Sequence, residues 1–249
     1  MKKLIAVFLV LAVVVLTFAS CGKLDFLDRF GVDNEQESQS EQGTEGLEYF
    51  PLSDGTYGVS AGTAKYCEEI IIPATHNEKA VTQIVNEGFK ECTNLKSVEI
   101  PDSVTSIGNY AFNRCGGLTS VTIGNGVTSI GDCAFRGCSG LTSVTIPDSV
   151  TSIGRGAFMD CDGLISIEIP DSVTSISDSA FRHCGGLTSI TIGNSVTSIG
   201  GAAFMGCRGL ASITYQGTME QWNTITNNDY LGLSGNCTIY CTDGNITKS

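Results

Sequence analysis

Basic side chains and histidine are scarce in this chain of 249 residues. There are 14 Lys and Arg against 26 Asp and Glu, which gives a formal net charge of −12, and there are two histidines. Nucleic-acid binding needs a basic patch, so this balance argues against it. Neither His76 nor His183 accompanies a C-x-x-C pair or a Ser-His-Asp arrangement, which leaves zinc coordination and nucleophilic catalysis without support. We therefore expect a protein that is not an enzyme and that holds no cofactor or metal.

Long apolar runs are also rare. The one that is present covers residues 4–18, is interrupted by Thr17 alone and follows the basic residues Lys2 and Lys3. It is too short for a comfortable membrane span, and it predicts a signal peptide over residues 1–20. The small residues before Cys21 resemble a bacterial lipoprotein box, although Phe18 stands where Leu is common. The resemblance implies lipid attachment at Cys21 and an exported, membrane-anchored lipoprotein on the bacterial cell surface. The alternative is an ordinary signal peptide with an incidental cysteine.

The next segment is polar and acidic. Residues 22–48 carry eight acidic and two basic side chains, and the run NEQESQSEQGTEG within them has no apolar side chain. Such a composition cannot form a packed core, so we expect residues 21–46 to be a lipidated cysteine followed by a disordered tether. An acidic ligand-binding tail is the alternative reading.

What the chain has in abundance is one unit of 23 residues, written six times over residues 81–218. The clearest copy, residues 127–149, reads VTSIGDCAFRGCSGLTSVTIPDS. We number its positions as columns 1 to 23. Column 1 is always Val, column 4 always Ile, column 9 always Phe and column 15 always Leu. A fixed period of this size indicates stacked repeats.

The columns also indicate how the unit folds. Columns 15, 18 and 20 read L-x-x-V/I-x-V/I, whose alternation is typical of a strand with one buried face. Pro-Asp-Ser or Gly-Asn-Ser/Gly then makes a corner, and V-T-x-I turns inward again. The stretch Ala-Phe-x-x-Cys predicts one helical or 3₁₀ turn. One repeat buries too little to fold alone, so we expect a right-handed parallel coil that advances by about 4.8 Å per repeat.

The pattern C-x-x-L-x-x-V/I-x-I-P-D-S-V-T-x-I-G-x-x-A-F-x-x-C resembles the BspA-like leucine-rich repeat of bacterial surface proteins, and the resemblance covers all six copies. It departs from the broader leucine-rich consensus because column 23 holds Ser, Gly or Thr instead of Asn. The resemblance implies an α/β repeat fold: a right-handed leucine-rich repeat solenoid of parallel short strands, mostly β with single helical turns. It also implies adhesion or binding of extracellular proteins.

Atypical segments flank the repeats. Residues 47–80 look like an N-terminal cap, in which residues 49–52 and 56–59 form a hairpin and residues 67–73 copy the strand of the repeat, with Cys67 in the Leu column. Residues 219–249 look like a C-terminal cap. We expect a short helix over residues 219–225 that carries Trp222, and then a final strand over residues 237–241.

Six of the eleven cysteines fall in column 12. Their period predicts an internal ladder of free, buried thiols that act as small apolar fillers. Disulfides between neighbouring turns are the alternative, but the side chains should point in parallel rather than at each other. Cys237 and Cys241 would lie about 13 Å apart on one strand, which is too far for a bond. The same geometry predicts that His183 points outward where Cys184 points inward.

Two surfaces are candidates for binding a partner. One is the outward side of the strand, where column 17 is always Ser and column 19 includes Glu99, Thr122, Thr145, Glu168 and Thr191. Ser and Thr also suit exposed strands without any ligand. The other surface comprises columns 6, 7, 10 and 11, which vary most between copies and include Tyr110, Arg114, Arg136, Arg155, Met159, Arg182 and His183. Variation there indicates either a specific partner or relaxed constraint.

The function that we infer is a cell-surface, non-enzymatic protein–protein interaction or adhesion module, anchored to the membrane through Cys21, with an extracellular protein as partner. The alternative is a passive structural component of the envelope without a specific ligand. Near-identical repeats favour this alternative, since a specific site usually breaks the repetition. An ice-binding role for the hydroxyl ladder is disfavoured by Glu99 and Glu168, and the oligomeric state stays open.

Overall fold

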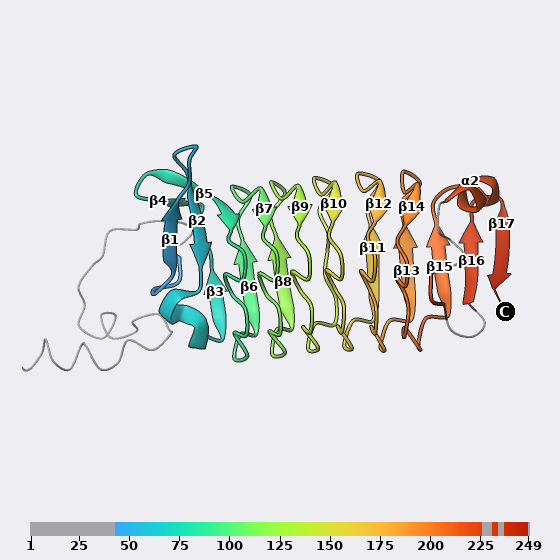
Figure 1. Ribbon diagram of the computed structural model, residues 1–249, viewed down its shortest axis with the longest axis horizontal. Helices are drawn as coiled ribbons and strands as arrows, with labels where there is room; N and C mark the ends of the chain where they lie inside the picture. Colours follow the sequence, from blue (N-terminus) through green and yellow to red (C-terminus); the bar gives the residue numbers. More distant parts are fainter. Residues whose placement is uncertain (1–42, 226–230, 234–236, 249) are drawn as a thin grey trace, which may run out of the picture. The chain divides into compact units, whose positions relative to one another are not determined.

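The computed structural model describes residues 43–225, 231–233 and 237–248, and it shows a mostly-β parallel solenoid with very little helix (Figure 1). Successive turns lie side by side along one axis, in sequence order. The 23-residue period therefore sets one turn of the coil, as the sequence predicts.

The N-terminal segment comprises β1 (Glu48–Pro51), β2 (Tyr57–Ser60), the 3₁₀ helix η2 (Gly62–Tyr66), β3 (Glu69–Ile71), β4 (Thr75–His76) and β5 (Lys79–Ile84). The L-x-x-V/I-x-V/I columns form β6 (Ser97–Ile100), β8 (Ser120–Ile123), β11 (Ser166–Ile169), β13 (Ser189–Ile192) and β15 (Ser212–Tyr215). The V-T-x-I columns form β7 (Ser106–Ile107), β9 (Ser129–Ile130), β10 (Ser152–Ile153), β12 (Ser175–Ile176) and β14 (Ser198–Ile199). The C-terminal segment comprises α2 (Met219–Thr224), β16 (Cys237–Cys241) and β17 (Gly244–Lys248).

The turns pair in register, column on column, because every copy has the same length. Ser166 lies opposite Ser189, and Ile167 lies opposite Ile190. The V-T-x-I strands belong to one nine-stranded sheet in the order β1-β2-β5-β7-β9-β10-β12-β14, with β4 beside β5. The longer strands form two separate sheets, β3-β6-β8 and β11-β13-β15-β16-β17. The solenoid therefore has two sheet-forming faces, and one of them is interrupted.

The constant apolar columns make one continuous core. The six Phe rings of column 9 are fully buried and stack on one another, with ring centroids 5.1 to 5.8 Å apart. The Leu, Ile and Val columns line the same interior, and their side chains are at most 8% exposed. Each buried side chain of this size contributes roughly 1.5–3 kcal/mol, so removing one Phe leaves a void in the middle of the stack.

The column 12 cysteines are buried thiols, as the sequence predicts. Five of the six thiols are more than apolar filler, because those of Cys115, Cys138, Cys161, Cys184 and Cys207 donate to the main chain of the preceding turn. The Cys115 Sγ lies 3.0 Å from the Phe89 carbonyl oxygen, and the Cys161 Sγ lies 3.1 Å from that of Phe135. Burial raises the pKa of the Cys161 thiol to about 12. This thiol therefore stays protonated and acts as a donor at neutral pH.

The prediction of one helical or 3₁₀ turn at Ala-Phe-x-x-Cys is wrong. This stretch forms tight turns in which two kinds of amide alternate. The Phe112 amide donates to the Ala134 carbonyl of the next turn at 2.7 Å, whereas the Asn113 amide donates back to Tyr110 at 3.1 Å. A helix would direct every amide along its own chain. Half of the amides in this stretch therefore donate to the next turn. They form a third row of main-chain hydrogen bonds along the axis, beside those of the two sheet-forming faces.

Both flanking segments contain the elements expected of them, with one exception. β1 and β2 form the antiparallel hairpin, and His76 stacks on Tyr49 with ring centroids 3.7 Å apart. At the other end, α2 begins with a capping box between Thr218 and Gln221, and it buries Trp222. β16 pairs with β15 but is not the final strand, because β17 follows it antiparallel.

Candidate interaction surface

The variable columns gather on one edge of the coil, where the tight turns lie. We call this the turn edge and define it as columns 6 to 11 of each copy: residues 86–91, 109–114, 132–137, 155–160, 178–183 and 201–206. The buried Phe of column 9 and Ala or Gly of column 8 hold each turn against the core. The side chains of columns 6, 7, 10 and 11 lie at or near the surface, apart from Asn113, which is 7% exposed, and Gly156, which is also buried.

The backbone of the turn edge is left-handed at two positions in every copy. Columns 7 and 11 have φ between +54° and +81° in all six turns. Glycine occupies three of these twelve positions, Gly137, Gly156 and Gly206. The other nine are Glu87, Glu91, Tyr110, Arg114, Cys133, Asp160, Ser179, His183 and Ala202. A residue other than glycine costs about 1–2 kcal/mol in this conformation, so the chain carries side chains where the fold itself favours glycine.

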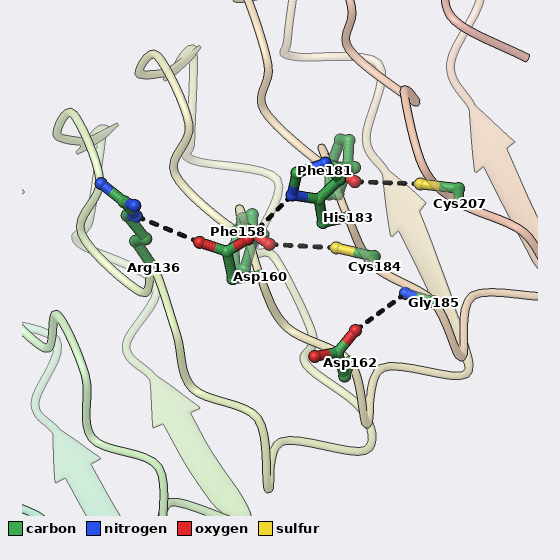
Figure 2. A network of polar contacts seen from close by, with 9 residues as sticks. All are labelled: Arg136, Phe158, Asp160, Asp162, Phe181, His183, Cys184, Gly185 and Cys207. Carbon is green, nitrogen blue, oxygen red and sulfur yellow. Dashed lines mark hydrogen bonds and ion pairs between the residues drawn. The ribbon is translucent and has the colours of Figure 1, made fainter.

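Asp160 joins side chains from three successive turns. Its Oδ2 lies 3.2 Å from the Nε of Arg136, and its Oδ1 lies 3.2 Å from the Nδ1 of His183 (Figure 2). A similar contact joins Arg114 to Glu91 at 3.3 Å. These groups are about one-third to two-thirds exposed, so each pair adds between about 0 and 1 kcal/mol to stability. Their main effect is to orient the side chains that the edge presents.

Column 6 has a structural task that limits its variation. The side chain of Asn86 accepts a hydrogen bond from the amide of Asn109 at 2.8 Å, and Asn109 accepts one from Asp132 at 2.8 Å. Asp132 in turn accepts one from the amide of Arg155 at 2.7 Å. An arginine cannot continue this ladder, because its guanidinium has no acceptor. Among the described residues, no acceptor serves the amide of Asp178. Arg155 therefore interrupts a stabilising ladder.

The remaining turn-edge candidates differ in exposure. Tyr110 and Met205 are exposed apolar side chains, at 39% and 44%. Met159 and Arg182 are half-buried. The Nε of Arg182 is fully buried, and it has no hydrogen-bond partner among the described residues. The edge thus combines aromatic, thioether and charged groups of both signs.

We call the side of the coil formed by the longer strands the strand face. It is more uniform in sequence than the turn edge, and it is divided into two separate sheets. Glu99 and Thr122 are exposed and lie opposite each other, as do Glu168 and the half-buried Thr191. Thr145 is exposed but lies in a stretch that is not assigned to a strand. Glu99 and Glu168 are three turns apart in the coil, so the structure does not bring the two carboxylates together.

The structure joins two of the seven turn-edge candidates, Arg136 and His183, through Asp160. The sequence places Asp160 among the variable columns but does not predict that it connects Arg136 and His183. The signal that identifies it is spacing, because Arg136, Asp160 and His183 are separated by 24 and 23 residues. As expected, His183 is exposed while Cys184 is buried (Figure 2).

The predicted lipid anchor, metal ligation and membrane-spanning helices are questions separate from the two candidate surfaces. Cys21, the predicted lipid attachment residue, lies outside the described residues, as do the predicted signal peptide and most of the tether. Within the described ranges, no group of three or more His, Cys, Asp or Glu side chains is placed to hold a metal ion. The described helices include none with the length and apolar character to cross a membrane.

The repeats and their stacking define the class of protein, a bacterial-type leucine-rich repeat solenoid. The family model for the BspA type leucine rich repeat region matches residues 63–139 and 105–230 with six copies, and the chain belongs to this family.

Solved structures of leucine-rich repeat proteins are similar to this chain. One is a T. pallidum leucine-rich repeat protein, with 25% identity over 68% of this chain and 90% of that chain, at a TM-score of 0.55. Another comes from Bacteroides ovatus, with 22% identity over 69% and 70% of the two chains, at 0.45. A third is a leucine-rich cell surface protein from Faecalibacterium prausnitzii, with 20% identity over 79% and 99%, at 0.27. No curated protein matches the chain.

Proposed function

We propose that this protein is a non-enzymatic, cell-surface module that binds an extracellular protein through its turn edge. The observation that carries the proposal is that six of the nine non-glycine residues at left-handed positions have large or charged side chains: Glu87, Glu91, Tyr110, Arg114, Asp160 and His183. Strained backbone of this kind tends to persist at sites of function, where a side chain is required in spite of its conformational energy. A purely structural coil would be expected to hold glycine there, as it does at Gly137 and Gly206.

The chemistry of the edge supports a protein as the partner. Tyr110, Met205 and several arginines are residue types that are enriched in the centres of protein interfaces. Charges of both signs alternate along the edge, with Arg136 beside Asp160 and Arg114 beside Glu91. Such a mixture suits a partner whose own charges alternate, and it does not suit a polyanion.

The structure of the repeat makes a rigid support for such a surface. Each turn is fixed to its neighbours by the Phe stack and by main-chain hydrogen bonds between turns. Side chains on rigid elements lose little freedom on binding. Contacts from several successive turns can therefore act together on one partner.

The lipid anchor and the tether belong to the same proposal. Residues 1–21 have the pattern of a signal peptide that ends in a lipoprotein box, and a lipidated Cys21 would hold the solenoid outside the cell. Metabolic labelling with a clickable fatty acid tests this. Label on the wild-type protein and none on Cys21→Ser is the expected result, whereas an unlabelled wild-type protein overturns the anchoring.

A capture experiment tests the binding site. The bait is the chain from residue 22 onward, presented to extracellular proteins, beside a variant with Tyr110→Gly, Arg114→Gly and His183→Gly. Glycine suits the left-handed backbone at these three positions, so the substitutions remove the side chains without straining the fold. The matched control carries Cys133→Gly, Ser179→Gly and Ala202→Gly, which make the same backbone change at positions with small side chains.

The outcomes separate the candidate functions. Saturable binding that the first variant loses and the control keeps places the site on the turn edge. Binding that survives in both variants moves the site to the strand face. A folded bait that captures nothing favours the passive structural component, which the near-identical repeats also suggest.

A further inference from the structure

The strand face contains a break at the third repeat. β8 pairs with β6 alone, and β11 pairs with β13 alone. Between them lies the stretch 143–146, which is not assigned to a strand. No main-chain group of residues 143–146 makes a hydrogen bond within the described residues. The residue just before this stretch, Thr142, accepts a hydrogen bond at its carbonyl from the Ile165 amide of the next turn, at 3.1 Å. In Figure 1 the arrows on this face stop after β8 and resume at β11.

The break is confined to this face. On the nine-stranded sheet, β9 pairs with β10 and β10 with β12, so pairing there is continuous through the same turns. On the turn edge, Phe112 and Phe135 donate to the following turns at 2.7 and 2.8 Å. Their rings and that of Phe158 stay stacked at 5.2 and 5.4 Å. Two faces thus hold the third turn in place while its strand face is open.

The inward-facing side chains of the strand face are slightly more exposed near the break than elsewhere. The inward side chains of this face are at most 2% exposed in β6, β13 and β15. Around the break, Val121, Ile123, Val144, Ile146 and Ile167 are 5–8% exposed, whereas Ile169 in β11 is fully buried. An increase this small means that the turns have spread without admitting another element. An added strand needs about twice the strand spacing, so the gap is not a site for a peptide from a partner.

The strand residues themselves do not explain the break, because residues 142–146 repeat residues 119–123 letter for letter. The corners that follow do differ. The amides of Gly193 and Gln216 donate to the preceding turn at Ile169 and Ile192, both at 2.9 Å. Pro147 and Pro170 occupy the corresponding corners of the third and fourth repeats, and proline has no amide hydrogen to donate. Within the six repeats, only this pair of neighbouring corners is Pro followed by Pro.

A single proline is not sufficient. Pro101 occupies the same corner after β6, and β6 still pairs with both β3 and β8. Two consecutive prolines remove the corner donors on both sides of residues 143–146, and this leaves the third strand without support from either neighbour. The break therefore coincides with the two consecutive corner prolines and not with a change in the strand sequence.

We propose that the third repeat is a hinge at which the solenoid bends by opening and closing its strand face. The continuous sheet and the Phe stack form the closed side, and residues 143–146 form the open side. The block up to β8 and the block from β11 onward move as rigid parts about this turn. The proposal does not depend on any partner, so it stands or falls separately from the binding function.

Hydrogen exchange tests the opening on the intact chain. The amides of residues 143–146 and of residues 189–192 in β13, which is paired on both sides, differ locally only by Val144 against Ile190, so their intrinsic exchange rates are closely matched. We expect the former to exchange at least about tenfold faster, because their amides lack acceptors. Equal protection of the two stretches would overturn the proposal.

Spin–spin distance measurement tests the bending. Labels carried by non-canonical amino acids at Thr122 and Glu168 span two turns across the break. Labels at Glu168 and Thr214 span two turns within β11-β13-β15, where pairing is continuous. The expected result is a broader distance distribution for the first pair. Equal widths would show that the coil does not bend at this turn.

The cause is tested by restoring the donors. Pro147→Gly with Pro170→Gly should slow exchange of residues 143–146 and narrow the first distribution, since Gly193, which occupies this corner, donates to the preceding turn. Pro101→Gly is the matched control and should change neither quantity. If the double variant exchanges as fast as the wild type, the proline account of the hinge is wrong.

Discussion

Two neighbouring alanines should respond in opposite ways to the same substitution. Ala202 lies at a left-handed position with φ of +56° and is half-buried, whereas Ala203 is fully buried and is not left-handed. Ala202→Gly relieves a strain of about 1–2 kcal/mol. It also gives the unfolded chain more freedom, which offsets about 0.5–1 kcal/mol of that gain. We therefore expect a net stabilisation of about 0.5 kcal/mol.

Ala203→Gly has the same effect on the unfolded chain but relieves no strain. It also removes a buried methyl group, which contributes about 0.8 kcal/mol. Together with the entropy term of about 0.5–1 kcal/mol, the expected destabilisation is about 1.5 kcal/mol. The two variants should thus differ by about 2 kcal/mol, or about 4–8 °C in Tm for a domain of this size.

Urea unfolding followed by circular dichroism measures both variants against the wild type. The comparison is internally controlled, because the chemical change is identical and the sites are adjacent. Equal destabilisation by the two substitutions would refute the left-handed backbone at column 7, and with it the argument that side chains there are retained for function.

Three further predictions follow from the core. Phe135→Ala removes one ring from a continuous stack and should destabilise the coil by about 3–5 kcal/mol; an unchanged melting temperature would contradict the burial of the Phe column. Burial raises the pKa of the Cys161 thiol from its ordinary value of 9.0 to about 12. The unfolded thiol loses its proton first as the pH rises, so the free energy of unfolding should fall from about pH 9 to pH 12, as measured by urea titration, and Cys161→Ala should weaken this dependence. In the native protein a maleimide should modify the half-buried Cys133 and spare Cys138; equal labelling would show that the cysteine ladder is open to solvent.

Much of the fold could be predicted from the repeat because its constant columns carry the packing. Phe, Leu, Ile and Val recur at fixed positions, and each lies in the core at the same place in every turn. The helix that carries Trp222 was also predictable, since Thr218 and Gln221 have the spacing of a capping box.

The geometry of the turn edge could not be predicted in the same way. Three glycines, Gly137, Gly156 and Gly206, mark the left-handed positions, but the other copies hold larger residues there and hide the signal. The sequence favours a helical turn around Phe, because local sequence does not show that the amides of this stretch bond to the next turn. β17 was missed for a related reason, since its pairing with β16 follows a tight turn after Cys241 rather than the repeat.

The break in the strand face could not be predicted from local sequence either, because residues 142–146 are identical to residues 119–123. What differs is the context, namely the prolines at two successive corners. An element can thus be lost through its neighbours' hydrogen-bonding capacity while its own sequence is ideal for a strand.

The contrast between the two candidate faces also bears on specificity. A partner that recognised the strand face would meet nearly the same Ser and Thr pattern in each turn, so several positions along the coil would bind it almost equally well. The turn edge has no such degeneracy, because Arg136, Asp160 and His183 come together at one place. A site there fixes one register and one copy of the partner per coil. Specific recognition would therefore require the columns that depart from the repeat, and two of these, columns 7 and 11, are left-handed positions where a side chain costs strain.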